Sequence, residues 1–413
     1  MLLSLFLAAT TIAGPVFAQN SAERPATPLS LEQALSLAEK NNPQLKAGSA
    51  LVERAHAGID TAKAYTNPSV EFLAGNQSAR PITTPGVPGL LLHYSAQQTL
   101  EIPSERRTRV RASRLELMGS EYELAGIRLS VTADVKRAFY EVLRRKQQLA
   151  YAKDNQSLVE DLRRRISVEV QVGEKGKLEL TRAEAELARA RAIVNSAEVE
   201  LANAQALLKA VIGADADDSF DPQGALSDQV KLARLDELRR RVFATHPALA
   251  EAKAQTAKAE TLIENERAKR IPQPTFYGEY ERQPDITFYR FGVNVPLPLW
   301  DRRKGPIAQA QADVKRTKAI TRQRELEILA ALERAYDQYQ ITDQQVQSLQ
   351  AGSRREAEAA VDAARSAYRF GERGILEVLD AQRVLQGVRN DLLDAEYARE
   401  SALIDLEELG AKP

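Results

Sequence analysis

The chain of 413 residues contains no cysteine, which excludes disulfide bonds, a thiolate nucleophile and cysteine-ligated metals. It also lacks an excess of charge, because 57 Lys and Arg balance 57 Asp and Glu. A neutral chain has no basic surplus for binding nucleic acid, so no nucleic-acid partner is predicted. Outside the N-terminus, no stretch has the roughly 18 apolar residues that a membrane-spanning helix needs.

Residues typical of catalytic sites are also scarce. The three histidines, His56, His93 and His246, are scattered along the chain. The sequence has no zinc-protease, serine-hydrolase or P-loop signature. It therefore predicts that the protein is not an enzyme, and it predicts neither a cofactor nor a bound metal.

Proline is missing from two long windows, 104–221 and 307–412, although the chain has 18 prolines. Because proline lacks a backbone donor and clashes with the preceding helical turn, its absence predicts long helices. Within these windows, small and aliphatic residues recur at spacings of four and three, the heptad pattern of packed helices. The pattern runs from Ala183 to Val211 and again from Ala381 to Leu409, where only Arg399 interrupts it.

One half of the sequence recurs in the other. Gly173-Glu174-Lys175-Gly176 returns as Gly371-Glu372-Arg373-Gly374, and Asn42-Pro43 returns as His246-Pro247. A tandem duplication predicts that each half is one structural unit. We expect these segments: an export signal at 1–18; a first repeat at 19–212, with a β-hairpin at 69–102 and a long helix hairpin at 104–212; a linker at 213–234; and a second repeat at 235–410, with a β-hairpin at 275–297 and a long helix hairpin at 307–410.

The export signal rests on an apolar stretch followed by small residues before a cleavage point after Ala18, although the usual basic start is missing. The helices after the glycine turns are too short to match those before them. A helix over 104–171 would extend roughly 100 Å, and one over 178–212 about half as far. By length, we expect 178–212 to continue into 235–269, and 31–63 to complete 376–409, which would close four helical columns into a cycle.

The only strand-like segments lie between the helices. Residues 90–102 and 287–297 alternate apolar and polar side chains, and each follows a shorter partner, at 69–74 and 275–281. Alternation over about ten residues is typical of a transmembrane β-strand. The alternative is two hairpins in a soluble sandwich. Because four strands cannot close a water-filled barrel, strands in a membrane must be shared, and three chains would supply twelve.

Several of these segments resemble the TolC-like outer-membrane efflux proteins. Residues 368–382, which include Gly371-Glu372-Arg373-Gly374, are similar to that family's most recognisable stretch, and 29–35 with Asn41-Asn42-Pro43 is also typical of it. Asn67-Pro68 and Ile102-Pro103-Ser104 look closest to the CzcC-like branch, which serves heavy-metal efflux. The resemblance implies a mainly α fold, with a long α-helical barrel in the periplasm and a trimeric twelve-stranded β-barrel in the outer membrane.

The resemblance also implies the partners. The chain would form a homotrimer in outer-membrane lipid and dock with a periplasmic adaptor (a membrane fusion protein) and an inner-membrane RND pump. It would be a passive gated conduit, with divalent heavy-metal cations as cargo. The lipid anchor of many relatives needs an N-terminal cysteine, so this chain is expected to be exported without lipidation. The open alternatives are a channel for drugs or other small organic molecules and a soluble exported coiled-coil scaffold or adaptor.

The motif match implies a gate at the helical turns. Glu377 and Asp380 match acidic rings at the periplasmic entrance, and Tyr368 and Arg373 match residues that tie the closed tip to the neighbouring helix pair, with an acceptor near Glu179. The alternative for each is a solvated charge on a long helix. The two turns would contact the adaptor, and their residues are Gly173, Glu174, Lys175, Gly176, Gly371, Glu372, Arg373 and Gly374.

The repeats differ at this predicted gate. The counterpart of Asp380 is Arg182, so a purely acidic stack of rings is not expected, and the counterpart of Ile375 is Lys177. We expect the gate to lie where the symmetry breaks.

Overall fold

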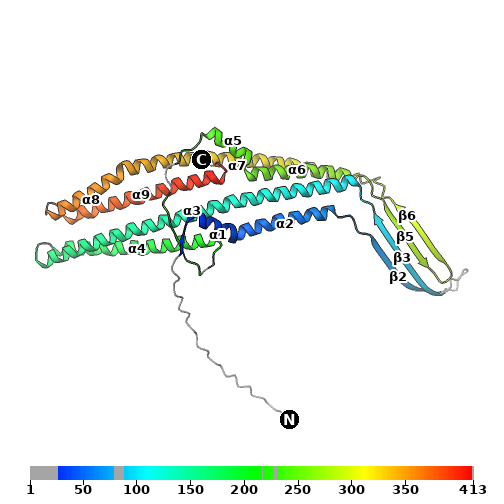
Figure 1. Ribbon diagram of the computed structural model, residues 1–413, viewed down its shortest axis with the longest axis horizontal. Coiled ribbons are helices and arrows are strands. Elements are labelled where there is room, and N and C mark those ends of the chain that lie inside the picture. Colours follow the sequence, from blue (N-terminus) through cyan, green and yellow to red (C-terminus); the bar gives the residue numbers. More distant parts are fainter. Residues whose placement is uncertain (1–26, 79–87, 216, 227–229, 412–413) are drawn as a thin grey trace, which may run out of the picture.

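The computed structural model describes residues 27–78, 88–215, 217–226 and 230–411. The predicted export signal at 1–18 lies outside these residues. The chain is elongated, with helices along most of its length, a four-stranded sheet at one end and two helical turns at the other (Figure 1). The sheet and the turns therefore lie at opposite ends of the protein.

The mainly helical fold predicted from proline placement is confirmed. The first repeat contains α1 (Leu31–Asn41), α2 (Pro43–Lys63), α3 (Pro103–Gln171) and α4 (Lys177–Ile212). The second contains α5 (Leu235–Thr245), α6 (Pro247–Ala268), α7 (Lys304–Ser348), α8 (Arg354–Arg369) and α9 (Ile375–Glu408), with a π-helix, η1 (Leu349–Ser353), between α7 and α8. α3 contacts α2, α4, α6 and α9, and α7 packs along α6 and α9.

The stacking predicted from helix lengths is wrong, because each half-length helix continues into a helix of its own repeat. The end of α4 meets the junction of α1 and α2, where Asn42 Nδ2 donates to the carbonyl of Val211 at 2.7 Å. The end of α9 meets the junction of α5 and α6, where Leu403 and Leu238 share a buried cluster. The reason is topological. α2 and α4 are joined to opposite ends of α3, so both pack along α3 and come end to end.

The sequence also predicted one helix over 31–63 and one over 235–269. In the structure each is broken at one X-Pro bond. Asn42 and His246 have ψ angles of 125° and 122°, because a following proline disfavours the helical region. Each residue then caps the next helix. Asn42 Oδ1 accepts from the N–H of Gln44 at 2.8 Å, and His246 Nδ1 accepts from the N–H of Ala248 at 3.2 Å.

The two predicted hairpins are joined in one antiparallel sheet. It consists of β2 (Ser69–Gln77), β3 (Gly89–Thr99), β5 (Thr275–Arg282) and β6 (Thr287–Asn294), in the order β2-β3-β5-β6. Within the described chain, β2 and β6 each pair on one side only. Two short strands, β1 (Thr27–Leu29) and β4 (Phe220–Pro222), pair in parallel near the middle of the protein. The large sheet therefore has two open edges in a single chain.

One face of the sheet is mostly apolar and the other mostly polar, as the alternation predicts, although Leu73 and Phe288 lie on the polar face. Phe72, Tyr94, Tyr280 and Tyr289 lie in register across the four strands, with successive ring centres 4.8, 6.0 and 5.2 Å apart. The next row lies on the other face and is polar, consisting of Glu71, Ser95, Glu279 and Arg290. None of the helices described here is long and apolar enough to cross a membrane.

The interruption of the second heptad pattern has a structural explanation. Arg399 is 7% exposed and pairs with Asp343 of α7, with 3.1 Å between Nη1 and Oδ1. The first repeat has Leu201 at the equivalent position, packed against a hydrophobic core. A buried pair therefore replaces an aliphatic contact in the second repeat only.

The π-helix is a second difference between the repeats. α3 runs without interruption for 69 residues, whereas η1 separates α7 from α8. Arg334 lies 197 residues after its counterpart Arg137, but Gly371 lies 198 residues after Gly173. One extra residue therefore lies between Arg334 and Gly371, and a π-helical turn accommodates it without ending the helix.

Candidate functional site at the helical turns

The two turns have the same backbone geometry. Gly173 and Gly371 have φ angles of 84° and 74°, a left-handed conformation that favours glycine after a helix. In both turns a backbone N–H reaches back five residues at 2.9 Å, from Glu174 to the carbonyl of Glu169 and from Glu372 to that of Ala367. The repeated sequence thus produces repeated structure at the tip.

Tyr368 attaches the second turn to the first. Its hydroxyl donates to Glu169 Oε2 at 3.0 Å, and Lys175 Nζ lies 5.9 Å from the centre of its ring. Burial, together with the hydrogen bond to Glu169, raises the pKa of Tyr368 well above its ordinary value. The phenol therefore stays protonated and able to donate. We call the contact among Tyr368, Glu169 and Lys175 the tyrosine latch.

Glu179 and Arg373, which the sequence predicted to take part in this attachment, are not part of the tyrosine latch. The sequence placed the acceptor of Tyr368 near Glu179, but the bond goes to Glu169 at the end of α3, and Glu179 adds negative charge beside the phenol. One carboxylate oxygen of Glu179 is buried without a hydrogen-bond partner among the residues described. Arg373 is exposed and forms no ion pair within residues 230–411 or the other described segments.

The two predicted gate acids are accessible. Glu377 and Asp380 are both exposed near the start of α9, where helix amides favour negative charge. The side chain of Asp380 is 70% exposed and pairs with Arg383 at 3.1 Å. Arg383 also reaches Glu186 of α4 at 2.8 Å, so this network joins the two helix hairpins. Its carboxylates hold the pKa of Arg383 above its ordinary value.

A hydrophobic cluster beneath the turns holds the hairpins together. Its buried members are Val159, Leu162, Ile166, Ala183, Leu187, Ile375, Val378 and Leu379. Ile375 is 2% exposed, whereas its counterpart Lys177 is exposed. The difference between Ile375 and Lys177 thus places an aliphatic side chain in the core that the hairpins share. The difference between Asp380 and Arg182 places opposite charges, both exposed, at equivalent positions of the two repeats.

Sequence reasoning missed Glu169, Arg383 and Glu186. The counterpart of Arg383 is Ala185, and that of Glu186 is Val384. A comparison of the repeats at each position would have shown both as unmatched charges. Glu169 gives no such signal, because its importance comes from the packing of α8 on α3.

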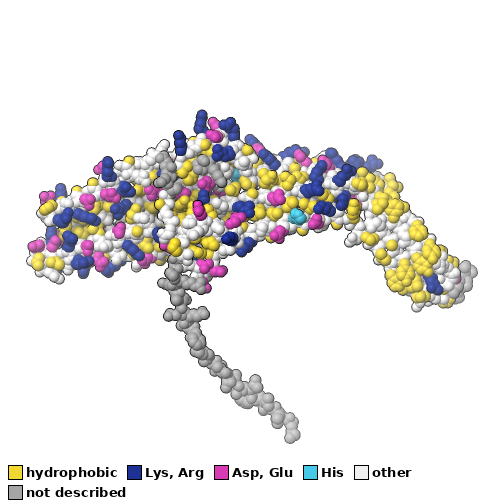
Figure 2. Space-filling view, viewed as in Figure 1, with side chains coloured by type: hydrophobic (Ala, Val, Ile, Leu, Met, Phe, Trp, Pro, Cys, Tyr) yellow, Lys and Arg dark blue, Asp and Glu magenta, His cyan; other side chains and the backbone are white. Residues whose placement is uncertain are grey.

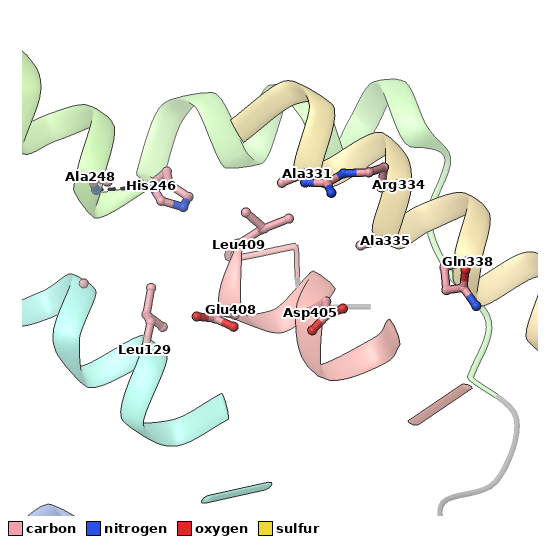
Figure 3. Close-up of a pocket in the computed structure, with 11 residues that line it drawn as sticks. Leu129, His246, Ala248, Ala331, Arg334, Ala335, Gln338, Asp405, Glu408 and Leu409 are labelled. Atoms are coloured by element: carbon pink, nitrogen blue, oxygen red, sulfur yellow. Dashed lines mark hydrogen bonds between the residues drawn. The ribbon is translucent and has the colours of Figure 1, made fainter. Parts of the chain in front are cut away.

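Away from the turns, a cavity of about 640 Å³ lies where the repeats meet near the middle of the protein. Figure 3 shows Asp405 and Glu408 of α9 together with His246 and Arg334. Arg137 pairs with both carboxylates at 2.6 Å, and burial lowers the pKa of His246. No group of three His, Cys, Asp or Glu in the described segments could hold a metal ion. The cavity therefore has the character of a structural junction.

Comparison with known proteins decides the family. The model of the family described as "Outer membrane efflux protein" matches residues 34–214 and 238–411. The chain belongs to the outer membrane efflux protein family. Members of this family are transport conduits, so the protein is an efflux channel and not an enzyme.

Individual proteins match most of this chain in sequence or in structure. The chain is 26% identical to the cobalt-zinc-cadmium resistance protein CzcC of Cupriavidus metallidurans, over 90% of this chain and 86% of that protein. Its fold is similar to the outer membrane channel CmeC of Campylobacter jejuni, with a TM-score of 0.80, 17% identity and coverage of 92% and 85%. It is also similar to CusC, with a TM-score of 0.78, 20% identity and coverage of 92% and 91%. These matches confirm the resemblance to TolC-like efflux proteins.

Proposed function

We propose that three copies of this chain form the outer-membrane channel of a tripartite efflux system. The observation that carries the proposal is the four-stranded sheet, which has open edges at β2 and β6 and one apolar face. Bilayers exclude open sheet edges, because unpaired backbone groups find no water there. Three sheets joined edge to edge make twelve strands with the row containing Phe72 and Tyr94 toward lipid.

In this arrangement the helical rod extends into the periplasm. The two repeats, 19–212 and 235–410, joined by the linker at 213–234, supply the columns of a helical barrel. The turns at Gly173–Gly176 and Gly371–Gly374 contact the adaptor, and an RND pump drives transport. Export by the signal at 1–18 and the absence of lipidation belong to this proposal.

The gate in this proposal lies at the tip. The tyrosine latch holds the α8–α9 hairpin against the α3–α4 hairpin, and its release lets the second hairpin move. Glu377 and Asp380, repeated in three chains, attract cations and repel one another across the axis. Arg373 and Glu179 supply the remaining charges at this level.

The proposed cargo is divalent heavy-metal cations. Support comes from the similarity to CzcC, whose name records cobalt, zinc and cadmium resistance, and from the exposed acids at the tip. A conduit does not need to coordinate its cargo tightly. Drugs and other small organic molecules are the second candidate class.

The channel proposal is tested by purifying the full chain from membranes. We expect a trimer that resists detergent until heated and forms conducting pores in a planar bilayer. Replacing Glu377 and Asp380 with Ala should reduce block by divalent cations at least several-fold. A soluble monomer without conductance contradicts the proposal.

The cargo is tested separately in cells. The chain, with the adaptor and pump encoded beside it, is expressed in a strain lacking its own efflux channel. We expect growth at higher cobalt, zinc or cadmium concentrations. Resistance gained only against organic compounds would assign the second cargo class and leave the channel proposal intact.

A further inference from the structure

Basic residues gather where the helices meet the sheet. Residues 103–114, the first turns of α3, contain five arginines and one acid, although the whole chain is neutral. Lys269, Arg270, Arg302 and Lys304 add positive charge where α6 ends and α7 begins. Figure 2 shows Lys and Arg side chains gathered over the helix ends beside the strands, next to hydrophobic side chains. The positive charge is therefore concentrated at one level of the rod.

At this level α3 carries a shallow groove of about 530 Å³. Five cations line it: Lys63, Arg106, Arg107, Arg111 and Arg114. We call it the basic groove. Carboxylates are absent from its lining residues, so an anion entering it meets only positive side chains and the small residues between them.

Three of these cations interact with a carboxylate or an aromatic ring. The other two do not, although Arg107 Nε donates to the carbonyl of Pro103 at 3.2 Å. Arg111 pairs with Glu264, Lys63 pairs with Asp60 at 3.2 Å, and the guanidinium of Arg106 lies 4.4 Å from the ring centre of Tyr65. Arg107 and Arg114 are exposed, and neither forms an ion pair within the described parts of the chain. Their charge is available to a ligand.

The groove lies on the face of α3 that its neighbours leave open. On one side, Arg106 and Arg109 donate to the carbonyls of Lys63 and Ala62 at the end of α2. On another side, Asn265 of α6 donates to Thr108 at 2.9 Å. Arg107 and Arg114 lie on the remaining face and are exposed to the surroundings of the protein.

The end of the groove nearest the sheet lies at the depth of a lipid headgroup. α3 begins at Pro103, just after β3 ends at Thr99. At 1.5 Å per residue, Arg107 lies about 6 Å and Arg114 about 16 Å along the helix. The headgroup layer extends about 5 to 8 Å beyond the hydrocarbon on each side, so Arg107 lies at its level. Arg114 lies beyond the layer, and its long side chain reaches back toward it, because helical side chains tilt toward the helix N-terminus.

We propose that the basic groove binds the phosphate headgroup of an anionic phospholipid in the leaflet beside the helices. The proposal rests on the membrane placement given under the proposed function. Arginine presents a planar fork of donors that matches phosphate oxygens, and basic pockets beside membrane segments bind anionic lipids. The bound lipid fixes how deep the sheet sits and seals the protein against the bilayer.

The test uses the purified full chain, stripped of lipid in neutral detergent. Phosphatidylglycerol and phosphatidylcholine with the same acyl chains are titrated separately, and bound lipids are counted by native mass spectrometry. We expect phosphatidylglycerol to bind preferentially. R107Q/R114Q should weaken that binding by roughly fivefold for each arginine removed. R107K/R114K keeps the charge but loses the planar fork of donors, so its affinity should lie between those of R107Q/R114Q and the unmodified chain.

Matched controls separate the outcomes. R189Q/R354Q removes two exposed arginines far from the sheet, which also form no ion pair among the described residues, and should bind like the unmodified chain. Equal lipid binding by R107Q/R114Q and the unmodified chain would overturn the proposal. So would competition by inorganic phosphate at the same concentration as the lipid, since that identifies a general anion site. Conductance of both double variants in neutral bilayers tests the channel proposal independently.

Discussion

The two long helix hairpins, α3–α4 and α7–α9, come from the same repeated sequence but differ in helix continuity and in buried charge. α3 is continuous, and Leu201 of α4 packs against the hydrophobic core that α3 and α4 share. The second hairpin contains the π-helix η1 and the buried pair of Arg399 with Asp343. π-Helical turns are rare and occur often at functional sites. We therefore expect the second hairpin to be the one that moves in the proposed gate, while the first stays in place.

Deleting one residue from each long helix tests this comparison with the largest expected effect. Removing Gly352 takes the extra residue from η1, so α7 and α8 should join as one α-helix with the tip register intact. α3 has no π-helical turn to absorb a deletion. Removing Ala150 therefore rotates the rest of α3, up to the turn at Gly173, by about 100° relative to the part before it. We expect trimers of the first variant only, by heat-resistant gel migration. Equal loss of the trimer in both variants would show that η1 does not accommodate an extra residue.

Converting Arg399 to the first-repeat residue tests the buried pair. R399L leaves Asp343 buried without its arginine, and loss of one member of a buried pair costs about 3 to 5 kcal/mol. The double variant R399L/D343L removes both charges and should recover most of that loss. Chemical unfolding of the purified trimer measures both. Two variants of equal stability would mean that the pair contributes little.

The latch is tested with Y368F, which removes the hydroxyl and keeps the ring. A hydrogen bond to a charged group contributes about 1.5 to 3 kcal/mol, so each broken latch should shift the closed-to-open ratio at least tenfold. We expect higher conductance in planar bilayers. Y151F is the matched control, because no hydrogen bond of the Tyr151 hydroxyl occurs among the described residues. Unchanged conductance in Y368F argues against a gate at this contact.

The tip turns allow a comparison within one loop. A side chain at Gly173, with φ of 84°, should cost about 1 to 2 kcal/mol. Gly176, at φ of −81°, has open space around it and an ordinary backbone. G173A should therefore lower the unfolding free energy, and G176A should leave it within about 0.5 kcal/mol. Thermal unfolding of the two variants under one condition is the measurement.

The smallest expected effect concerns pH. Burial, with the nearby charge of Glu407, raises the pKa of Glu400, whose first-repeat counterpart is Ala202. Because the folded state binds this proton more tightly than the unfolded state, stability falls as pH rises from the ordinary pKa of a glutamate to the raised pKa, and it falls no further above that. E400Q stays neutral, so it should gain stability relative to the parent as pH rises. Parallel unfolding curves at all pH values would contradict this.

Parts of this fold follow from the sequence and parts do not. The proline-free windows, the glycine turns and the strand alternation act over a few residues, so they predict α3, the turn at Gly173 and the apolar row through Tyr94. The same local signals do not say which half-helix follows α4, because α2 and α6 have similar lengths. Asn42-Pro43 and His246-Pro247 predict a repeat, and the helix breaks at these two bonds are seen only in the structure.

At the candidate site, the motif located Tyr368, Glu377 and Asp380, and the structure determined their contacts. Tyr368 donates to Glu169 because α8 packs on the end of α3, a pairing between positions about 200 residues apart. The sequence by itself determined the repeat, the helices and the two faces of the sheet, since these depend on local sterics and periodicity. Only the tertiary structure decided the order of the columns, the joining of the hairpins and the latch, because these depend on which surfaces meet.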